Sequence, residues 1–182
     1  MSTFLLPDTT VLVNFALLNQ LPALRAYLGA RGRACEAVID EVQDLSAGRV
    51  PKLQEVDCID WFGSPIRIEG VDNIAAVNLL RTAVFGGSAL LPRQHLGECQ
   101  TIHAVRTMSE YSESIVITDD RSAFEYAKGR GMVVRHSVDV MREMVAFDGL
   151  DPNMALAWVA FLDADDRGGL LEIPRTSAEL VR

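Results

Sequence analysis

The sequence has few of the features that mark secreted, membrane-spanning or zinc–thiolate proteins. Only three of its 182 residues are cysteines and none forms a Cys-x-x-Cys pair, so neither a disulfide framework nor a thiolate zinc site is expected. Charged residues, glycine and proline interrupt every apolar run before it reaches the roughly 18 residues that span a bilayer. The start of the chain also lacks the basic and apolar stretches of a secretory signal. We therefore expect a cytoplasmic protein with no membrane partner.

Basic residues are also scarce relative to acidic ones. The chain has 17 lysines and arginines against 25 acids, for a formal net charge of −8. Residues 139–182 hold nine of the acids and four arginines, a net of −5. Long-range attraction of a phosphate backbone is weak for such a chain without bound cations. The charge therefore argues against a high-affinity nucleic-acid binder but does not exclude a small nuclease.

Short apolar runs alternate with helical stretches, a pattern typical of an α/β fold with a central parallel sheet covered on both faces. The hydrophobic share of 49% is enough for a real core. We expect strands at 4–6, 33–38, 66–68, 114–118 and 132–135, the 33–38 strand passing into a helix that runs to 47. Further helices are expected at 14–28 with a break at Pro22, 51–61, 73–85 with Asp72 as its cap, 96–108, 121–128, 138–147 and 152–162.

The chain divides into a main domain, residues 1–148, and a helical C-terminal extension, residues 149–182. Residues 163–169 are polar and rich in glycine, so the last dozen or so residues are expected to form a flexible acidic tail.

Acidic residues follow two of the expected strands directly. Asp8 comes after the first strand, and Asp119 and Asp120 come after the strand at 114–118. Ligands of open α/β sheets bind at the carboxyl ends of the strands, so these carboxylates could meet in one crevice. Each could instead be a simple helix cap, and for either one alone that explanation is the commoner.

Two glutamates lie on the apolar stripes of expected helices. Glu41 is three residues after Val38, and Glu98 is four residues before Ile102. A carboxylate buried there without a partner costs several kcal/mol or takes up a proton, and no Lys or Arg lies three or four residues from either glutamate. Either a shared cation compensates the charge, or the stripes fray and both glutamates reach water.

Several carboxylates from separate elements, without thiolates or a clear histidine partner, suit a hard cation such as Mg²⁺ or Mn²⁺. Such an ion can activate a water and stabilise charge on a phosphoryl group. Thr10 and Asn14 are placed to hold the first carboxylate or a bound water, Thr118 lies beside Asp119, and Arg121 could contact a phosphate. We therefore assign Thr10, Asn14, Thr118 and Arg121 to substrate binding. The histidines, including His95 three residues before Glu98, are expected to have structural or surface roles.

Four segments, in order, resemble the motifs of the PIN-domain family, which includes the VapC-like toxin ribonucleases. They are LPDTTVLVNF at 6–15, VIDEV at 38–42, LGECQTIHA at 96–104 and ITDDRSAF at 117–124. The resemblance covers roughly residues 3 to 140. It implies a three-layer α/β/α fold and a Mg²⁺- or Mn²⁺-dependent endoribonuclease.

The resemblance also assigns roles to residues and partners. It implies catalytic residues Asp8, Glu41, Glu98, Asp120 and Asp119, with metal held by Asp8, Glu98 and one of Asp120 or Asp119, of which we favour Asp120. It further implies an RNA substrate, a homodimer and a small antitoxin protein as partner.

Other acidic α/β sites fit the sequence less well. A haloacid-dehalogenase phosphatase needs a second Asp at position 10, which is Thr10, and a nucleotide-binding module needs more than Gly86-Gly87 as a phosphate loop. A receiver domain needs a paired acid before the first strand's Asp and a late Lys, and neither is clear. The remaining alternative is a PIN-like module that binds metal or a protein partner with little or no nuclease activity.

Overall fold

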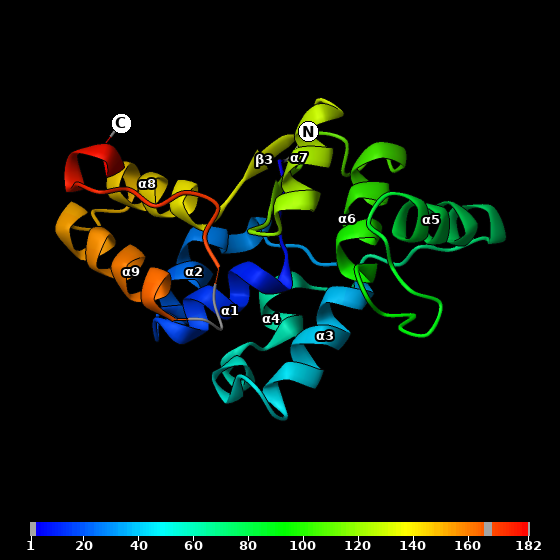
Figure 1. Ribbon diagram of the computed structural model, residues 1–182, viewed down its shortest axis with the longest axis horizontal. Helices are drawn as coiled ribbons and strands as arrows, with labels where there is room; N and C mark the ends of the chain where they lie inside the picture. The colour runs from blue at the N-terminus through cyan, green and yellow to red at the C-terminus, as the bar shows by residue number, and fades with distance from the viewer. Residues whose placement is uncertain (1–2, 166–168, 182) are drawn as a thin grey trace.

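The computed structural model describes residues 3–165 and 169–181 and contains a small parallel sheet. Its strands are β1 (Leu5–Pro7), β2 (Ile115–Ile117) and β3 (Val133–Arg135), in the order β1-β2-β3 (Figure 1). Leu5 pairs with Ile115, and Ile115 pairs with Val133. The α/β class with a parallel sheet, predicted from the sequence, is confirmed.

Helices make up most of the rest of the described chain. They are α1 (Thr9–Leu17), α2 (Leu21–Leu28), α3 (Glu36–Ser46), α4 (Cys58–Phe62), α5 (Val71–Ala83), α6 (Leu96–Thr107), α7 (Arg121–Gly129), α8 (Ser137–Phe147) and α9 (Pro152–Ala164). Short 3₁₀ turns are η1 (Gly29–Arg31), η2 (Pro51–Glu55) and η3 (Ser177–Leu180). None of the helices in the described part of the chain is both long and apolar enough to cross a lipid bilayer.

Apolar side chains cover both faces of the sheet. Leu5 and Ile117 belong to a large buried cluster that includes residues of α1, α2, α3, α8 and α9. Leu6, which follows Leu5, and Val116, which precedes Ile117, belong to a second cluster with Val105 of α6. Successive strand residues point to opposite faces, so the two clusters lie on opposite sides. Figure 1 accordingly shows α8 and α9 on one side of the sheet and α5 and α6 on the other.

Two expected strands are only single bridges. Cys35 bridges Ile66, and Gly32 bridges Leu5, but α3 already begins at Glu36. The chain between Gly32 and Cys35 is therefore too short for a ladder, although Arg33 donates its backbone N–H to the carbonyl of Leu5 at 2.9 Å. The β-branched and apolar residues at 66–68 predict a strand, but the described residues provide no extended neighbour long enough to pair with it.

Two helix boundaries also differ from the prediction. The helix expected at 14–28 is two helices, with Pro22 in the first turn of α2, and the first of them begins five residues earlier at Thr9. The cap of α5 is Gly70, so Asp72 lies in the first turn of that helix and is not its cap. Pro22 is placed as expected, because the first turn of a helix does not use the N–H that proline lacks.

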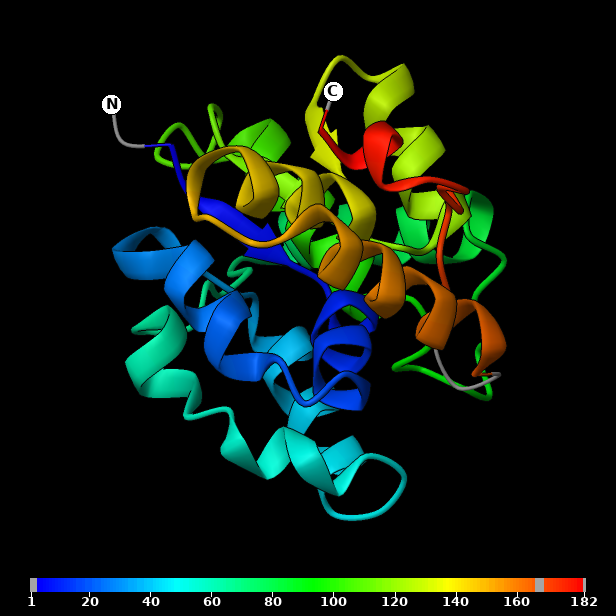
Figure 2. The same ribbon diagram turned by 90° about the vertical axis from the view of Figure 1, so that its left-hand side faces the viewer.

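The C-terminal segment packs against the main domain. Trp158 of α9 and Leu180 of η3 are buried in the same cluster as Phe15 of α1. Figure 2 shows α9 (orange) beside α8 (gold), and Figure 1 shows the described residues after α9 passing across α8. The flexible tail expected for the last dozen or so residues is not what the described residues up to Val181 show, because Leu180 is completely buried; residue 182 lies outside the described residues. The elements on either side of the expected boundary at 148 share one hydrophobic core.

Candidate metal centre

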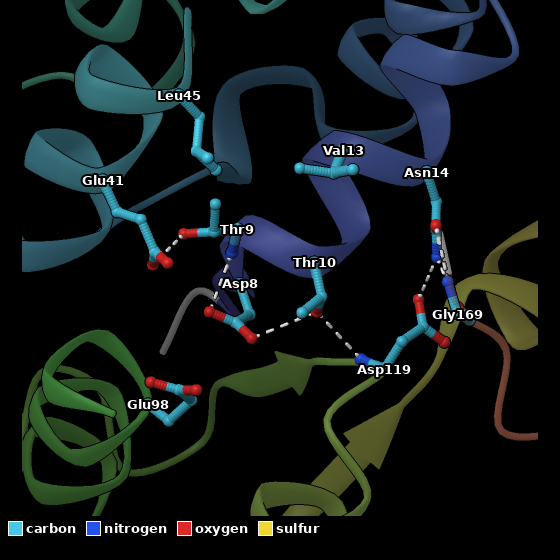
Figure 3. A pocket seen from close by; sticks show the side chains of 10 residues that line it. All are labelled: Asp8, Thr9, Thr10, Val13, Asn14, Glu41, Leu45, Glu98, Asp119 and Gly169. Carbon is cyan, nitrogen blue, oxygen red and sulfur yellow. Dashed lines mark hydrogen bonds between the residues drawn. The ribbon is translucent and has the colours of Figure 1, made fainter. Parts of the chain in front are cut away.

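A pocket of about 170 Å³ opens at the carboxyl end of β1. Three carboxylates point into it, Asp8 from the end of β1, Glu41 from α3 and Glu98 from α6 (Figure 3). The other lining residues are Thr9, Thr10, Val13, Asn14, Leu45, Asp119 and Gly169. The acids therefore meet as the sequence predicts, at the edge of the sheet where ligands of parallel α/β folds bind.

Asp8 is held firmly by its neighbours. It is 4% exposed and caps α1, accepting a hydrogen bond from the backbone N–H of Thr9 at 2.8 Å. Its other oxygen accepts hydrogen bonds from the hydroxyls of Thr10 at 3.1 Å and Thr118 at 3.0 Å. Both threonines therefore hold the first carboxylate, the position predicted for Thr10. Asp8 is also a helix cap, so the two explanations offered by the sequence apply together.

The two glutamates come from helices that approach each other closely. Glu41 accepts a hydrogen bond from the Thr9 hydroxyl at 2.7 Å, and Glu98 lies in the first turn of α6. Gly97 allows this approach, because a Cβ at that position would lie 3.0 Å from the Cγ2 atom of Val38 in α3. The pairing of α3 with α6 thus brings both glutamates to the pocket.

Burial and mutual repulsion make Asp8 and Glu98 hard to ionise together. The pKa of Asp8 is raised well above its ordinary value, first by burial and then by the charges of Glu98 and Glu41. Burial also raises the pKa of Glu98 to about 7; its own backbone hydrogen bond acts in the other direction, and Glu41 and Asp120 raise it further. No arginine or lysine among the described residues forms an ion pair with Asp8, Glu41 or Glu98.

Asp120 lies on the Glu98 side of this group. One ligand atom each from Asp120, Glu98 and His95 lie within 4.8 Å of one another. His95 Nδ1 is 3.4 Å from the carboxylate of Glu98. Asp120 also caps α7, accepting a hydrogen bond from the backbone N–H of Ala123 at 2.7 Å. The preference for Asp120 over Asp119 as a ligand agrees with this placement.

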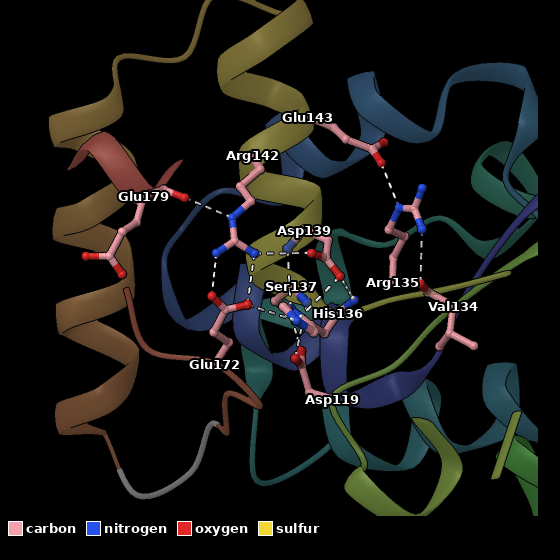
Figure 4. Close-up of polar contacts among 10 residues, drawn as sticks. All are labelled: Asp119, Val134, Arg135, His136, Ser137, Asp139, Arg142, Glu143, Glu172 and Glu179. Atoms are coloured by element: carbon pink, nitrogen blue, oxygen red, sulfur yellow. Dashed lines mark hydrogen bonds and ion pairs between the residues drawn. The ribbon is translucent and has the colours of Figure 1, made fainter. Parts of the chain in front are cut away.

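Asp119 lines the pocket but turns its carboxylate toward other partners. One of its oxygens accepts a hydrogen bond from the Asn14 amide at 2.9 Å and another from the Ser137 hydroxyl, and the second oxygen accepts one from the backbone N–H of Ser137 at 3.1 Å (Figures 3 and 4). Burial raises the pKa of Asp119, and the hydrogen bonds from Ser137 act against that rise. Asp119 is therefore placed to orient the pocket wall.

Asn14 connects the pocket to the C-terminal segment. Its amide donates to the carbonyl of Gly169 at 2.8 Å, and its carbonyl accepts from the Gly169 N–H at 3.3 Å. Asn14 thus bonds to Asp119, Ser137 and Gly169, and it makes no hydrogen bond to Asp8 among the described residues. The sequence contained no signal for Gly169, which lies 155 residues away along the chain.

Arg121 is the one predicted site residue that does not join the group. It is exposed in the first turn of α7, and within the described chain it has no hydrogen bond or ion pair to the acids.

Sequence reasoning missed two contributors, Thr9 and His95. For His95 a signal existed, the His-x-x-Glu spacing at the start of α6, but His95 reaches Glu98 through a left-handed backbone at φ 60°, which spacing does not predict.

The donor set fits a hard divalent cation. Its ligand atoms are carboxylate oxygens with one imidazole nitrogen and no thiolate, which suits Mg²⁺ or Mn²⁺. A cation here would also remove the electrostatic cost of the buried acids. His95, Glu98 and Asp120 place ligand atoms within 4.8 Å of one another and could hold it, and Asp8 and Glu41 line the adjoining pocket with Glu98.

A second group of possible ligands, His136, Asp139 and Glu172, is already compensated. Arg142 pairs with Asp139 at 3.2 Å and contacts both carboxylate oxygens of Glu172 (Figure 4). His136 lies 3.4 Å from Asp139 and caps α8. The arginine supplies the positive charge that the pocket acids lack, so this group fastens the C-terminal segment to α8 and is not a metal centre.

Comparisons of the chain with protein-family models, with curated proteins and with solved structures found no match.

Proposed function

We propose that this protein is a metal-dependent endoribonuclease with a PIN-like, three-layer α/β/α fold. The observation that carries the proposal is the pocket itself. Asp8, which is buried, Glu98, which is half-buried, and Glu41, which is exposed, come from three separate segments and line one pocket without an ion pair to arginine or lysine in the described chain. Such an arrangement is costly unless a cation occupies it, and cation-loaded carboxylate sites are typical of phosphodiester hydrolysis.

The metal would supply an activated water and charge stabilisation at the phosphoryl group. The chain's own residues position the acids. Thr10 and Thr118 fix one oxygen of Asp8, and Thr9 fixes Glu41. Asp119 and Asn14 brace the wall of the pocket through Ser137 and Gly169. In this proposal Asp8, Glu98 and Asp120 are the metal ligands, with Glu41 completing the charge.

RNA is the substrate class that the four motifs favour. The motifs also favour a cytoplasmic setting, a homodimer and a small antitoxin protein, all of which stay predictions. A PIN-like module that binds metal without turnover is the competing proposal. The two differ in one measurable property, which is whether RNA is cut.

The test is cleavage of a mixed pool of structured and single-stranded RNA in Mg²⁺ or Mn²⁺. We expect the wild type to cut and Asp8→Asn to lose at least about a hundredfold in rate, because the substitution removes a charged ligand. Asp163→Asn is the matched control, since Asp163 is an exposed acid of α9 outside the pocket. It should cut like the wild type.

Two results would contradict the nuclease. Equal cutting by the wild type and by Asp8→Asn would show that a contaminant cuts the RNA and that the pocket is not the active site. Metal binding by the wild type, measured by calorimetry with Mn²⁺, without cutting of any RNA in the pool would favour the binding module. Circular dichroism of each variant shows whether the fold is intact.

A further inference from the structure

Aromatic side chains continue from the metal centre across the surface between α5, α6 and α7. The ring of His95, beside Glu98, lies 6.0 Å from the ring of Phe85 between centroids. Phe85 in turn lies 5.6 Å from Tyr126 of α7, edge to face. Phe85 and Tyr126 are half-buried, so part of each ring faces solvent.

Arginines flank the far end of this row. The guanidinium of Arg130 lies over the Tyr126 ring, 4.9 Å from its centroid, and Arg106 of α6 donates a hydrogen bond to the Tyr126 hydroxyl at 3.4 Å. Both arginines are exposed. We call the residues Phe85, Tyr126, Arg106 and Arg130 the aromatic–basic surface.

These cations are not neutralised by neighbouring acids. Six of the described arginines and lysines are held in ion pairs, as Arg93 is with Asp44. Arg106 and Arg130 have no carboxylate within ion-pair distance in the described chain, and neither has Arg121 at the start of α7. Glu125 is the exposed acid on the same helix, and it forms no ion pair with them. A chain of net charge −8 thus keeps a local patch of free positive charge.

The patch is connected to the pocket by α7 itself. Asp120 caps this helix, and its nine residues span about 13 Å at about 1.5 Å per residue. Arg121 lies at the pocket end, Tyr126 in the middle and Arg130 just beyond the last residue. A nucleic-acid strand that enters the pocket at this end would therefore pass along α7.

We propose that the aromatic–basic surface binds a single-stranded stretch of nucleic acid next to the phosphate that is cut. This proposal rests on the nuclease function proposed above. Phe85 and Tyr126 offer ring surfaces on which unpaired bases stack, and Arg106 and Arg130 neutralise backbone phosphates. Stacking on aromatic rings tolerates any base and requires bases that are not already stacked in a duplex. The surface therefore selects for strandedness and not for sequence.

The test is the affinity of a short, fluorescent, single-stranded RNA of mixed sequence for the Asp8→Asn protein, which keeps the nucleic acid intact. Adding Tyr126→Leu, which retains the apolar volume but removes the ring, should weaken binding on the order of tenfold. Adding Arg130→Gln should weaken binding and lower the slope of affinity against salt by about one. A hairpin RNA without single-stranded ends should bind weakly and should respond little to Tyr126→Leu.

Matched controls lie elsewhere on the surface. Phe147→Leu removes an aromatic ring that is 83% exposed at the end of α8, and Arg49→Gln removes an exposed arginine after α3. Neither should change the affinity. Equal losses for Phe147→Leu and Tyr126→Leu, no loss for Tyr126→Leu, or no binding of the single strand at all would overturn the proposal.

Cleavage by the protein with an intact Asp8 separates this proposal from the nuclease. If that protein cuts RNA but Tyr126→Leu leaves its KM unchanged, the aromatic–basic surface is wrong and the nuclease stands. If it cuts no RNA but its binding of the single strand still depends on the Tyr126 ring, the proposed nuclease function is wrong and the proposed binding surface is supported.

Discussion

Asp8 and Asp120 each combine a structural role with a candidate chemical one. Asp8 caps α1, and Asp120 caps α7, yet both carboxylates lie beside Glu98. A carboxylate that caps a helix is fixed in position by backbone N–H groups, and the oxygen that accepts the capping hydrogen bond keeps a further lone pair. Helix capping thus fixes the direction of these two aspartates.

Glu98 makes stability depend on pH in the metal-free protein. Its pKa rises from 4.5 to about 7 on folding, so between these values the folded state keeps a proton that the unfolded state releases. The free energy of unfolding should therefore fall as the pH rises through this range, by on the order of 3 kcal/mol for this group. Urea unfolding in EDTA, from about pH 5 to about pH 8, measures this fall.

Glu98→Gln should flatten that profile, because the amide carries no proton to lose. Part of the slope should persist, since the pKa of Asp8 is raised in the same direction. Glu113→Gln, at an exposed position, is the control and should keep the wild-type profile. Mn²⁺ should stabilise the wild type most at high pH, where the ligands are deprotonated. If Glu98→Gln left the dependence of the unfolding free energy on pH unchanged, the raised pKa of Glu98 would not be its source.

At the scale of elements, the contact between α3 and α6 determines the spacing of the two glutamates. A Cβ at Gly97 would meet the Cγ2 atom of Val38 at 3.0 Å and would lie 3.8 Å from an oxygen of Glu41. Gly97→Ala should push the helices apart by a few tenths of an ångström. We expect Mn²⁺ to bind roughly tenfold more weakly, as for other changes just outside a ligand shell.

Isothermal titration with Mn²⁺ measures the effect of Gly97→Ala. Gly48→Ala is the matched control, because a Cβ there meets no atom within 4 Å. Alanine also has the higher helix propensity, so Gly97→Ala should lose affinity without a comparable loss of stability. Unchanged Mn²⁺ affinity would show that α3 and α6 can accommodate the added Cβ without moving the two carboxylates.

The elements that carry the site are those that periodicity predicts best. Glu41 and Glu98 were expected on apolar stripes, buried or frayed to water, and the strand before Asp119 from its β-branched run; Glu98 is half-buried, Glu41 is exposed, and both line the pocket with Asp119. Asp119 and Asp120 could not be separated by spacing alone. Ser137 and Asn14 draw Asp119 away, and both contacts are long-range. Local signals therefore located the acids, and tertiary contacts decided their roles.

At the scale of the whole molecule, the C-terminal segment is fastened at three places. Gly169 binds Asn14 at the pocket, Glu172 binds Arg142, and Leu180 is completely buried between α8 and α9. The polar, glycine-rich stretch before it predicts a flexible tail, because composition reports the average of a segment. One buried leucine and one arginine pair outweigh that average here.

Leu180→Ala should therefore destabilise the entire protein and not only its end. Removing a completely buried leucine side chain should lower the free energy of unfolding by about 2–4 kcal/mol. The single-tryptophan variants Trp61→Phe and Trp158→Phe report separately on α9 and on α4, which lie far apart in the sequence. In urea, both probes should show one coincident transition, shifted equally by Leu180→Ala.

Val181→Ala is the control for that experiment, since Val181 is 62% exposed and its truncation should cost no more than about 0.5 kcal/mol. If the Trp158 signal moved to lower urea while the Trp61 signal stayed in place, residues 149–182 would unfold on their own. The extension would then be a separate unit, as its composition suggests. Coincident shifts would instead mean that the segment reaching Asn14 at the pocket is as stable as the core, because Leu180 belongs to the same buried cluster as Phe15.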